Sequence, residues 1–415
     1  MKRVVVTGLG AITPIGNNIK EYFDGLSKGR SGAAEITHFD ATHFRTRFAC
    51  EVKNFNPNDY FNRKEARKMD LFCQLAMVAT DEAMLDSGLD VENVDLDRAG
   101  VIWGVGMGGL RSLEKEIEDF ALGNGTPRYN PFMVPKMIPD IAAGMISIKY
   151  GFRGVNYATV SACASSSHAI GNAFDRIRLG REDIVICGGS EASIEKPTMG
   201  GFNSMKALSE RNDDPTTASR PFDLDRDGFV VGEGAGSIVL ESYEHATKRG
   251  ATIYAEVCGS GASADAYHIT APHPDGLGAR NVMKFALSDA KMNPEEIHYV
   301  NVHGTSTPLG DVAETKAILQ VFGDHAYKMN ISSTKSMTGH LLGGAGAIEA
   351  IAGILGMHHG VVPPTINHFT SDPAIDNKLN FTFNEAQERP IKAFLSNTFG
   401  FGGHNSSLIF KKFEA

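Results

Sequence analysis

The stretch VSACASSSHAIGNA, residues 160–173, places a single cysteine, Cys163, where a predicted strand meets a predicted helix. VNYATVSA before it is typical of a short strand, and apolar residues recur at helical spacing in the following ASSSHAIGNAFDRIRLG. A strand that runs directly into a helix is a building unit of α/β folds. The unpaired N–H groups of a helix N-terminus lower the pKa of a thiol. The junction therefore favours a nucleophile, although most free cysteines are simply small buried side chains.

Outward from this junction, strand-like and helical patterns alternate along the chain. KRVVV, AGVIWGVG and DIVICGG are typical of strands, and RKEARKMDLFCQLAMVATDEAM of a helix. Several predicted strands are apolar at consecutive positions, as in sheets that are covered on both faces. VVVTGLGA (4–11) and AEVCGSGA (255–262) each run from a strand into GxGA. We therefore predict an α/β fold of two halves, residues 1–250 and 251–415, packed as one body.

Composition restricts the possible functions of this 415-residue chain. Its net charge of −9 argues against nucleic acid or an anionic membrane as the main partner. No apolar run approaches the roughly 20 residues that cross a bilayer, and no signal peptide is evident. The five cysteines are scattered without CxxC spacing, which argues against disulfides or a zinc site. We therefore expect a cytoplasmic protein.

Two motifs in the first half are misleading. GVGMGG (104–109) fits GxGxxG, but the region about 20 residues on is the loop GTPRYNP rather than a strand ending in an acid. DLDRDGFVVGE (223–233) begins like a calcium loop, but Gly234 stands where the twelfth-position acid is required. We interpret both as turn sequences, and reject dinucleotide and calcium binding.

Two histidines could partner a thiol nucleophile. His303 follows a predicted strand in VNVHGTSTPLGD. His340 stands at a glycine-rich helix start in STKSMTGHLLGGAGAIEA, five residues after Lys335. Such strand ends and helix starts are where α/β folds place their sites. The residues alone indicate cysteine-dependent acyl chemistry, with purely structural roles for Cys163 and the histidines as the open alternative.

Five sequence blocks together resemble those of a known family. SACASSSHAIG, HGTSTPLGD, STKSMTGHLLGGAG, SNTFGFGGHN and SRPFDLDRDGFVVGEGAG resemble those of the β-ketoacyl-acyl carrier protein synthases, most closely the elongating type called synthase II. The resemblance implies a thiolase-like fold, with two similar βαβαβ halves packed as a five-layer αβαβα sandwich. It also implies a homodimer that needs no cofactor. The implied reaction is a decarboxylating Claisen condensation, in fatty acid synthesis, of malonyl-acyl carrier protein with a cysteine-bound acyl chain.

The resemblance also implies roles for individual residues of the reaction centre. Cys163 would be the acylated nucleophile, and neutral His303 and His340 would stabilise the enolate left by decarboxylation. Lys335, together with Glu314, would set the surroundings of His340. The backbone N–H groups of Cys163 and Phe401 would form the oxyanion hole.

Further residues are implied for binding. The substrate set is Thr305 and Thr307 for pantetheine, Met107 and Phe202 for the acyl tunnel, and Phe399 and Phe401 for its gate. The carrier-protein docking set is Lys64, Arg67 and Lys68 on one helical face, with Lys206 and Arg128. A structural monovalent cation would lie at Asn301, Val302, Glu349, Ser396 and Asn397. His404 departs from the family, which has threonine or a similar residue there.

The sequence also has to be compared with several alternative functions. A thiolase needs a second cysteine near the C-terminus, and an initiating synthase has asparagine at the position of His340. A non-catalytic chain-length factor would lack Cys163. A polyketide-type ketosynthase and a cysteine hydrolase are further alternatives. Met107 and Phe202 are almost as well explained by core packing.

Overall fold

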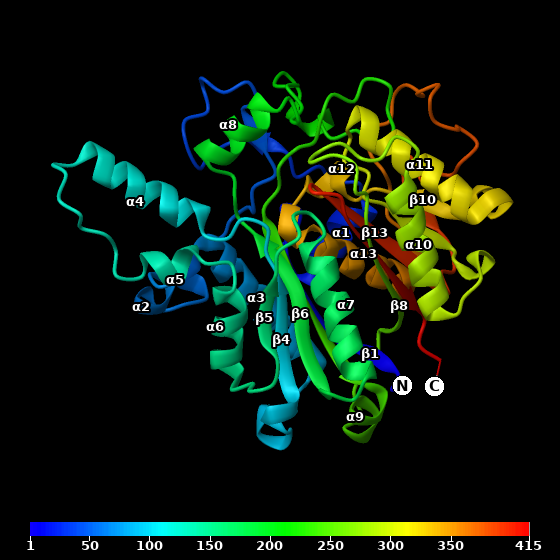
Figure 1. Cartoon of the computed structure of the whole chain (residues 1–415), viewed down its shortest axis with the longest axis horizontal. Coiled ribbons are helices and arrows are strands. Elements are labelled where there is room, and N and C mark those ends of the chain that lie inside the picture. Colours follow the sequence, from blue (N-terminus) through cyan, green and yellow to red (C-terminus); the bar gives the residue numbers. More distant parts are fainter. Residues whose placement is uncertain (415) are drawn as a thin grey trace.

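Ten strands form one mixed sheet at the centre of the computed structural model, which describes residues 1–414 (Figure 1). The first five are β1 (Val4–Ile12), β4 (Ala99–Gly104), β5 (Asn156–Thr159), β6 (Ile184–Glu191) and β7 (Gly234–Ser242). The other five are β8 (Ala255–Ala264), β9 (Tyr299–Asn301), β10 (Asn330–Ser332), β13 (Ala393–Gly400) and β14 (His404–Lys411). Two short ladders, β2 (Ala34–Glu35) with β3 (Phe48–Ala49) and β11 (Val361–Val362) with β12 (Gln387–Glu388), lie outside this sheet.

The strand order shows that the two halves have the same topology. From its outer edge inward, the first half runs β5-β4-β6-β7-β1 and the second β10-β9-β13-β14-β8. In both halves the three outer strands are parallel, and the fourth in this order is antiparallel to its neighbours. β1 and β8 join the halves through antiparallel pairing of Val4–Val6 with Ala255–Val257. The predicted α/β fold of two similar halves is confirmed, whereas the boundary near Gly250 stays a prediction.

Helices complete five layers (Figure 1). On the outer face of the first half lie α3 (Leu71–Ser87) and α6 (Ile141–Tyr150), and on that of the second half α10 (Leu277–Ala290) and α11 (Pro308–Phe322). Between the halves, α7 (Ser165–Arg178) packs against α13 (Ala345–His359). The remaining helices are α1 (Ile19–Ser27), α2 (Arg63–Ala66), α4 (Leu110–Leu122), α5 (Met133–Met137), α8 (Lys196–Ser204), α9 (Tyr243–Lys248) and α12 (Lys335–Thr338).

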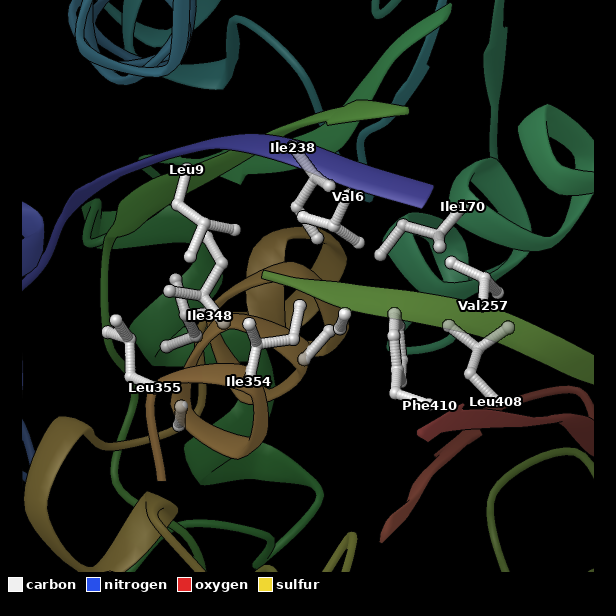
Figure 2. Close-up of a cluster of buried hydrophobic side chains, with 14 of the residues drawn as sticks. Val6, Leu9, Ile170, Ile238, Val257, Ile348, Ile354, Leu355, Leu408 and Phe410 are labelled. Carbon is white, nitrogen blue, oxygen red and sulfur yellow. The ribbon is translucent and has the colours of Figure 1, made fainter. Parts of the chain in front are cut away.

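The central helix α13 explains how the two halves form one body. Every residue from Ala345 to Met357 is buried, and all except Glu349 are apolar or glycine, as expected of a helix inside a core. Figure 2 shows the cluster around it: Val6, Leu9 and Ile238 on one side, Ile348, Ile354 and Leu355 of α13, and Ile170, Val257, Leu408 and Phe410. Strands of both halves thus bury side chains in a single core, which positions the loops at their ends rigidly.

The structure corrects one predicted helix. The run from Arg63 to Met84 is not continuous, because α2 ends at Ala66 and α3 begins at Leu71. Asp70 causes the break, since its side chain caps α3 by accepting a hydrogen bond from the backbone N–H of Phe72. Arg67 and Lys68 therefore lie in the turn, and the predicted helical face of Lys64, Arg67 and Lys68 is wrong.

The two misleading motifs serve the fold itself. After β4, the carboxylate of buried Glu191 accepts the backbone N–H groups of Gly106 (2.9 Å) and Met107 (3.2 Å), so these donors are already used by the protein. Asp223 accepts the N–H groups of Asp225, Phe369 and Thr370. β7 follows this segment where a calcium loop requires a helix. Both interpretations as turns are confirmed.

Candidate active site

Cys163 lies in the tight turn between β5 and α7, as the sequence predicts. β5 ends at Thr159 and α7 begins at Ser165. Ala162, which precedes the cysteine, has a φ of 50°, in the left-handed region that non-glycine residues seldom occupy. Such backbone strain is typical of functional turns. Cys163 itself is only 8% exposed.

Both predicted histidines meet this cysteine. Nε2 of His340 lies 2.9 Å from Sγ of Cys163. The ring of His303 is nearly perpendicular to that of His340, at 85°, with centroids 5.3 Å apart. One ligand atom from each of the three side chains lies within 4.8 Å of the other two. Segments far apart in sequence are thus brought together in one catalytic group.

Backbone hydrogen bonds position the two histidine loops. The N–H groups of His303 and Gly304 donate to the two oxygens of Glu314, at 3.0 and 2.8 Å. The N–H of His340 donates to the carbonyl of Val230 at 2.7 Å. The first loop is thereby tied to α11 and the second to the segment before β7.

Lys335 and Glu314 bind different partners near the histidines. Lys335 Nζ forms an ion pair with Glu349 of α13, and both side chains are at most 2% exposed. Glu314 instead binds the His303 loop and accepts a hydrogen bond from Nδ2 of Asn397 at 3.2 Å. Burial raises the pKa of Glu314 to about 7, although its backbone N–H donors oppose the rise. Glu349 is therefore the ion-pair partner of Lys335, and the implied role of Lys335 and Glu314 in setting the surroundings of His340 stays a prediction.

Burial decides the protonation state of the group. It lowers the pKa of both His303 and His340 well below the ordinary value, and the Lys335 ammonium lowers them further. Both imidazoles are therefore neutral at pH 7, as expected. Burial also raises the pKa of the Cys163 thiol to about 12, against opposing effects of Lys335 and the Phe401 N–H. The expected lowering of this pKa is wrong, because desolvation outweighs the helix N-terminus.

A cavity of about 530 Å³ opens onto the three side chains. All of the predicted substrate residues line it: Met107, Phe202, Thr305, Thr307, Phe399 and Phe401. The hydroxyl oxygens of Thr305 and Thr307 are 3.1 Å apart. Phe202 stands between Phe229 and Phe401, with ring centroids at 5.2 and 6.5 Å. The structure therefore places the apolar and hydroxyl residues around one entrance.

Some lining residues escaped the sequence analysis. Phe229 packs edge-on against His340, with ring centroids 5.5 Å apart. Phe229 lies within DLDRDGFVVGE, part of one of the blocks that resemble the family. That segment was interpreted only as a turn, so Phe229 was not predicted at the site. Asp265 and His273 come from a loop after β8 that carried no motif. None of the other four cysteines lines this cavity within residues 1–414.

The predicted docking residues are on the surface. Lys64, Arg67, Lys68, Arg128 and Lys206 are all exposed. Lys206 also lines the active-site cavity. Lys68 Nζ lies 5.7 Å from the ring centre of Phe132, beside α5. Figure 1 shows α2 next to α5 and α8 farther up the same side of the molecule. The docking role stays a prediction.

The residues predicted for a monovalent cation offer unused oxygen atoms. Asn301 Oδ1, Glu349 Oε2 and Ser396 Oγ are buried and have no hydrogen-bond partner within residues 1–414. Ser396 pairs with Asn301 in the β9–β13 register. Hard cations prefer such oxygen ligands, so the donor set fits. The Asn397 side chain is already engaged with Glu314 and Ser407. Asn397 and Val302 could therefore offer a cation their backbone carbonyl oxygens.

His404, the departure from the family, lies at the start of β14. Its side chain is exposed and lies against Gly402. A Cβ atom placed on Gly402 would be only 2.9 Å from Nε2 of His404. The imidazole therefore covers the FGFGG segment that carries Phe399 and Phe401. The next residue, Asn405, donates to Asp265 at 2.8 Å, which joins this segment to the loop after β8.

Comparison with known proteins gives a consistent result. Residues 1–246 match the family "Beta-ketoacyl synthase, N-terminal domain", and residues 254–369 match "Beta-ketoacyl synthase, C-terminal domain". The chain is 50% identical over 413 residues to a 3-oxoacyl-[acyl-carrier-protein] synthase 2 of Synechocystis sp., covering 100% of this chain and 99% of that protein. A Staphylococcus aureus protein of the same name is 49% identical over 417 residues, with the same coverage.

Solved structures agree with this result. A beta-ketoacyl synthase from Burkholderia phymatum superposes with a TM-score of 0.92 at 38% identity, covering both chains completely. The ishigamide ketosynthase/chain length factor gives 0.93 at 35% identity, also with complete coverage. In residues 1–414 no helix has both the length and the apolar character to span a membrane.

Proposed function

The chain belongs to the β-ketoacyl synthase family, and from this premise we propose that it condenses malonyl-acyl carrier protein with an enzyme-bound acyl chain to give 3-oxoacyl-acyl carrier protein. The observation that carries the proposal is the 2.9 Å contact between Cys163 Sγ and His340 Nε2, with His303 beside them in an enclosed cavity. The reaction is an acyl transfer of the elongating kind, as in fatty acid synthesis.

In the first step the acyl chain moves to Cys163. The thiol is neutral in the free protein, because burial raises its pKa to about 12. His340 Nε2 is positioned to accept the thiol proton as sulfur attacks the thioester carbonyl, and to return it to the departing pantetheine thiolate. The carbonyl oxygen is stabilised by backbone N–H groups of Cys163 and Phe401, of which the latter already points at the sulfur.

In the second step malonyl-carrier protein loses carbon dioxide. The electron pair of the broken C–C bond passes to the thioester oxygen as an enolate. His303 can donate an N–H group to that oxygen, and so can His340 once its single proton is carried on Nε2; both rings are neutral because of burial and Lys335. Their rings face the same cavity from perpendicular directions.

In the third step the enolate carbon attacks the acyl group on Cys163. A new C–C bond forms, the C–S bond breaks, and the chain leaves two carbons longer on the carrier. Phe202 and Phe401 enclose the reacting thioester and limit its hydrolysis by water. Cys163 leaves as a thiolate and takes up one proton from solvent, which restores the thiol for another cycle.

The substrate arrives on the pantetheine arm of a carrier protein. Thr305 and Thr307 offer hydroxyl groups at the cavity entrance, where the amides of the arm would pass. The carrier protein would dock on Lys64, Arg67, Lys68, Lys206 and Arg128, whose positive charge suits an acidic partner. One solved relative is described as a type II polyketide acyl-carrier protein in complex with its ketosynthase.

We also propose that two copies of the chain pair through β5. This strand ends the sheet in the described residues, which leaves one row of its backbone groups without a neighbouring strand. Tyr157, Val160 and Ile148 nearby are 37%, 59% and 76% exposed. A second copy would continue the sheet and cover these apolar side chains. The resulting homodimer would work in the cytoplasm without nucleic acid or membrane.

Two alternatives share the fold. A chain-length factor is disfavoured because Cys163, His303 and His340 are all present and in contact. A polyketide ketosynthase is disfavoured by identity, which is 33% to the polyketide relative and 50% to the Synechocystis protein. The test is to supply acyl- and malonyl-carrier protein. One round of condensation to the 3-oxoacyl product supports the proposal, whereas hydrolysis alone, no product, or repeated extension without reduction would refute it.

A further inference from the structure

The active-site cavity gathers three side chains that also suit a transition metal. We propose that Cys163, His303 and His340 form an inhibitory Zn²⁺ site, with the fourth coordination position open to the cavity. The inhibitory part of this proposal rests on the proposed function, whereas the binding part does not. In residues 1–414 this is the only group of three or more His, Cys, Asp and Glu side chains with ligand atoms this close.

The ligand atoms are close to the distances that zinc requires. Zinc binds sulfur at about 2.3 Å and imidazole nitrogen at about 2.0–2.1 Å in tetrahedral geometry, which separates its ligand atoms by roughly 3.3 to 3.6 Å. Here Sγ and Nε2 of His340 are 2.9 Å apart, and the three ligand atoms lie within 4.8 Å of one another. Small side-chain rotations therefore suffice. Cysteine and histidine are also the ligands that zinc prefers.

The surroundings permit binding of moderate strength. Nδ1 of both histidines has no hydrogen-bond partner within residues 1–414, so no second contact fixes the rings, and the affinity is weaker than in a site with such support. The Lys335 ammonium opposes a dication, but its ion pair with Glu349 offsets that charge. The cavity provides the entry path.

Binding and catalysis exclude each other. When zinc binds, the S–H bond of Cys163 breaks, an S–Zn bond forms, and the proton leaves to the buffer without any change of oxidation state. The same sulfur is needed to receive the acyl chain, and both imidazoles are needed for decarboxylation. Zinc is therefore a competitor of the acyl thioester, and an acylated cysteine cannot bind it as a thiolate.

Metal titration of the full chain tests the binding. Zn²⁺ is added to chelator-treated protein in a calorimeter, and Co²⁺ is added to a second sample for absorption spectroscopy. We expect one site per chain with micromolar affinity, and with Co²⁺ a sulfur-to-metal charge-transfer band. Cys163→Ala should abolish the band and weaken binding at least tenfold, whereas His303→Ala should weaken binding at least tenfold and keep the band in the metal-bound fraction. Cys258→Ala, at a partly exposed cysteine outside the cavity, should change neither.

Acylation provides a control without mutation. Wild-type protein acylated on Cys163 should take up no metal, and zinc should slow alkylation of Cys163 until a chelator is added. Absence of a site, or binding that survives Cys163→Ala, overturns the proposal. Failure of the proposed function would be seen separately, as metal-free protein that binds zinc but makes no condensation product.

Discussion

Nε2 of His340 lies 2.9 Å from Sγ of Cys163, although 177 positions separate the two residues in sequence. The contact gives the thiol a proton acceptor inside the cavity of about 530 Å³. In the proposed reaction only the cysteine carries the acyl chain, whereas His303 and His340 act on the malonyl group and His340 also accepts the thiol proton.

This division of duties predicts the behaviour of Cys163→Ala. The variant should show no mass increase on incubation with acyl-carrier protein, and condensation should fall about a thousandfold or more, because the nucleophile is gone. Release of carbon dioxide from malonyl-carrier protein should continue, since His303 and His340 remain. Mass spectrometry of the intact protein and a decarboxylation assay check the two parts. An acyl adduct on the variant would disprove the assignment.

The raised thiol pKa predicts how alkylation depends on pH. Because burial raises the pKa of Cys163 to about 12, the thiolate fraction should grow about tenfold per pH unit from pH 7 to 10. The rate of alkylation by iodoacetamide, followed by mass spectrometry, should rise over this whole range. A plateau above an inflection at or below pH 8 would show that the helix N-terminus outweighs burial after all.

The lowered histidine pKa values predict how the stability of the protein depends on pH. His303 and His340 titrate well below their ordinary pKa when folded, so the unfolded chain binds more protons between the folded and unfolded values. Their contribution to stability should be complete above the unfolded pKa of about 6.5 and should be lost as pH falls below it. The double variant His303→Gln/His340→Gln should show less loss of Tm between pH 7 and 5 than wild type. An equal loss in both proteins would contradict the assignment.

The ion pair of Lys335 with Glu349 predicts unequal effects of two Glu→Gln changes. Glu349→Gln leaves a buried ammonium without its counter-ion, which costs about 3–5 kcal/mol of unfolding free energy. Glu314→Gln should cost less, because its main partners are uncharged backbone N–H groups. Denaturant unfolding measures both. A larger loss for Glu314→Gln than for Glu349→Gln would contradict this assignment of the ion pair.

This pair also shows where sequence reasoning stopped. Cys163, His303 and His340 could be predicted because each lies at a strand end or helix start within a recognisable block, and two similar halves could be predicted from alternating elements. The choice of Glu349 over Glu314 depends on how α13 packs between the halves, which no local pattern records. The direction of the thiol pKa shift could not be predicted either. The helix N-terminus lowers this pKa and burial raises it, and the extent of burial depends on the whole fold.

Glu191 predicts a positioning effect without contact to substrate. Its carboxylate accepts the N–H groups of Gly106, Met107 and Gly343, and thereby joins the Met107 loop to the turn after His340. In Glu191→Gln the new NH₂ group faces these N–H donors, so the hydrogen bonds that join the Met107 loop to the turn after His340 should weaken. We expect a drop in kcat of about tenfold and an altered preference among acyl chain lengths. Asp70→Asn, at a buried acid that binds Ser112 away from the active-site cavity, is the matched control and should keep the wild-type length preference.

Arg226 is the second positioning residue, and it acts on the pantetheine entrance. Its guanidinium is 3% exposed and donates to the carbonyls of Thr307 (3.1 Å) and Pro308 (3.0 Å), while Asp372 holds it from the other side at 2.7 Å. This arrangement fixes the loop that carries Thr305 and Thr307, whose middle residue Ser306 has a φ of 67°.

Arg226→Lys keeps the charge but cannot reach these carbonyls with the planar fork of arginine. We expect KM for malonyl-carrier protein to rise about tenfold, with kcat changed less than threefold, because the threonines bind the arm and take no part in bond making. Arg249→Lys, at a half-buried arginine paired with Glu241 outside the cavity, is the matched control. Steady-state kinetics of both variants measure these changes in KM and kcat. A fall in kcat at unchanged KM would place Arg226 in the support of His303 rather than of the pantetheine loop.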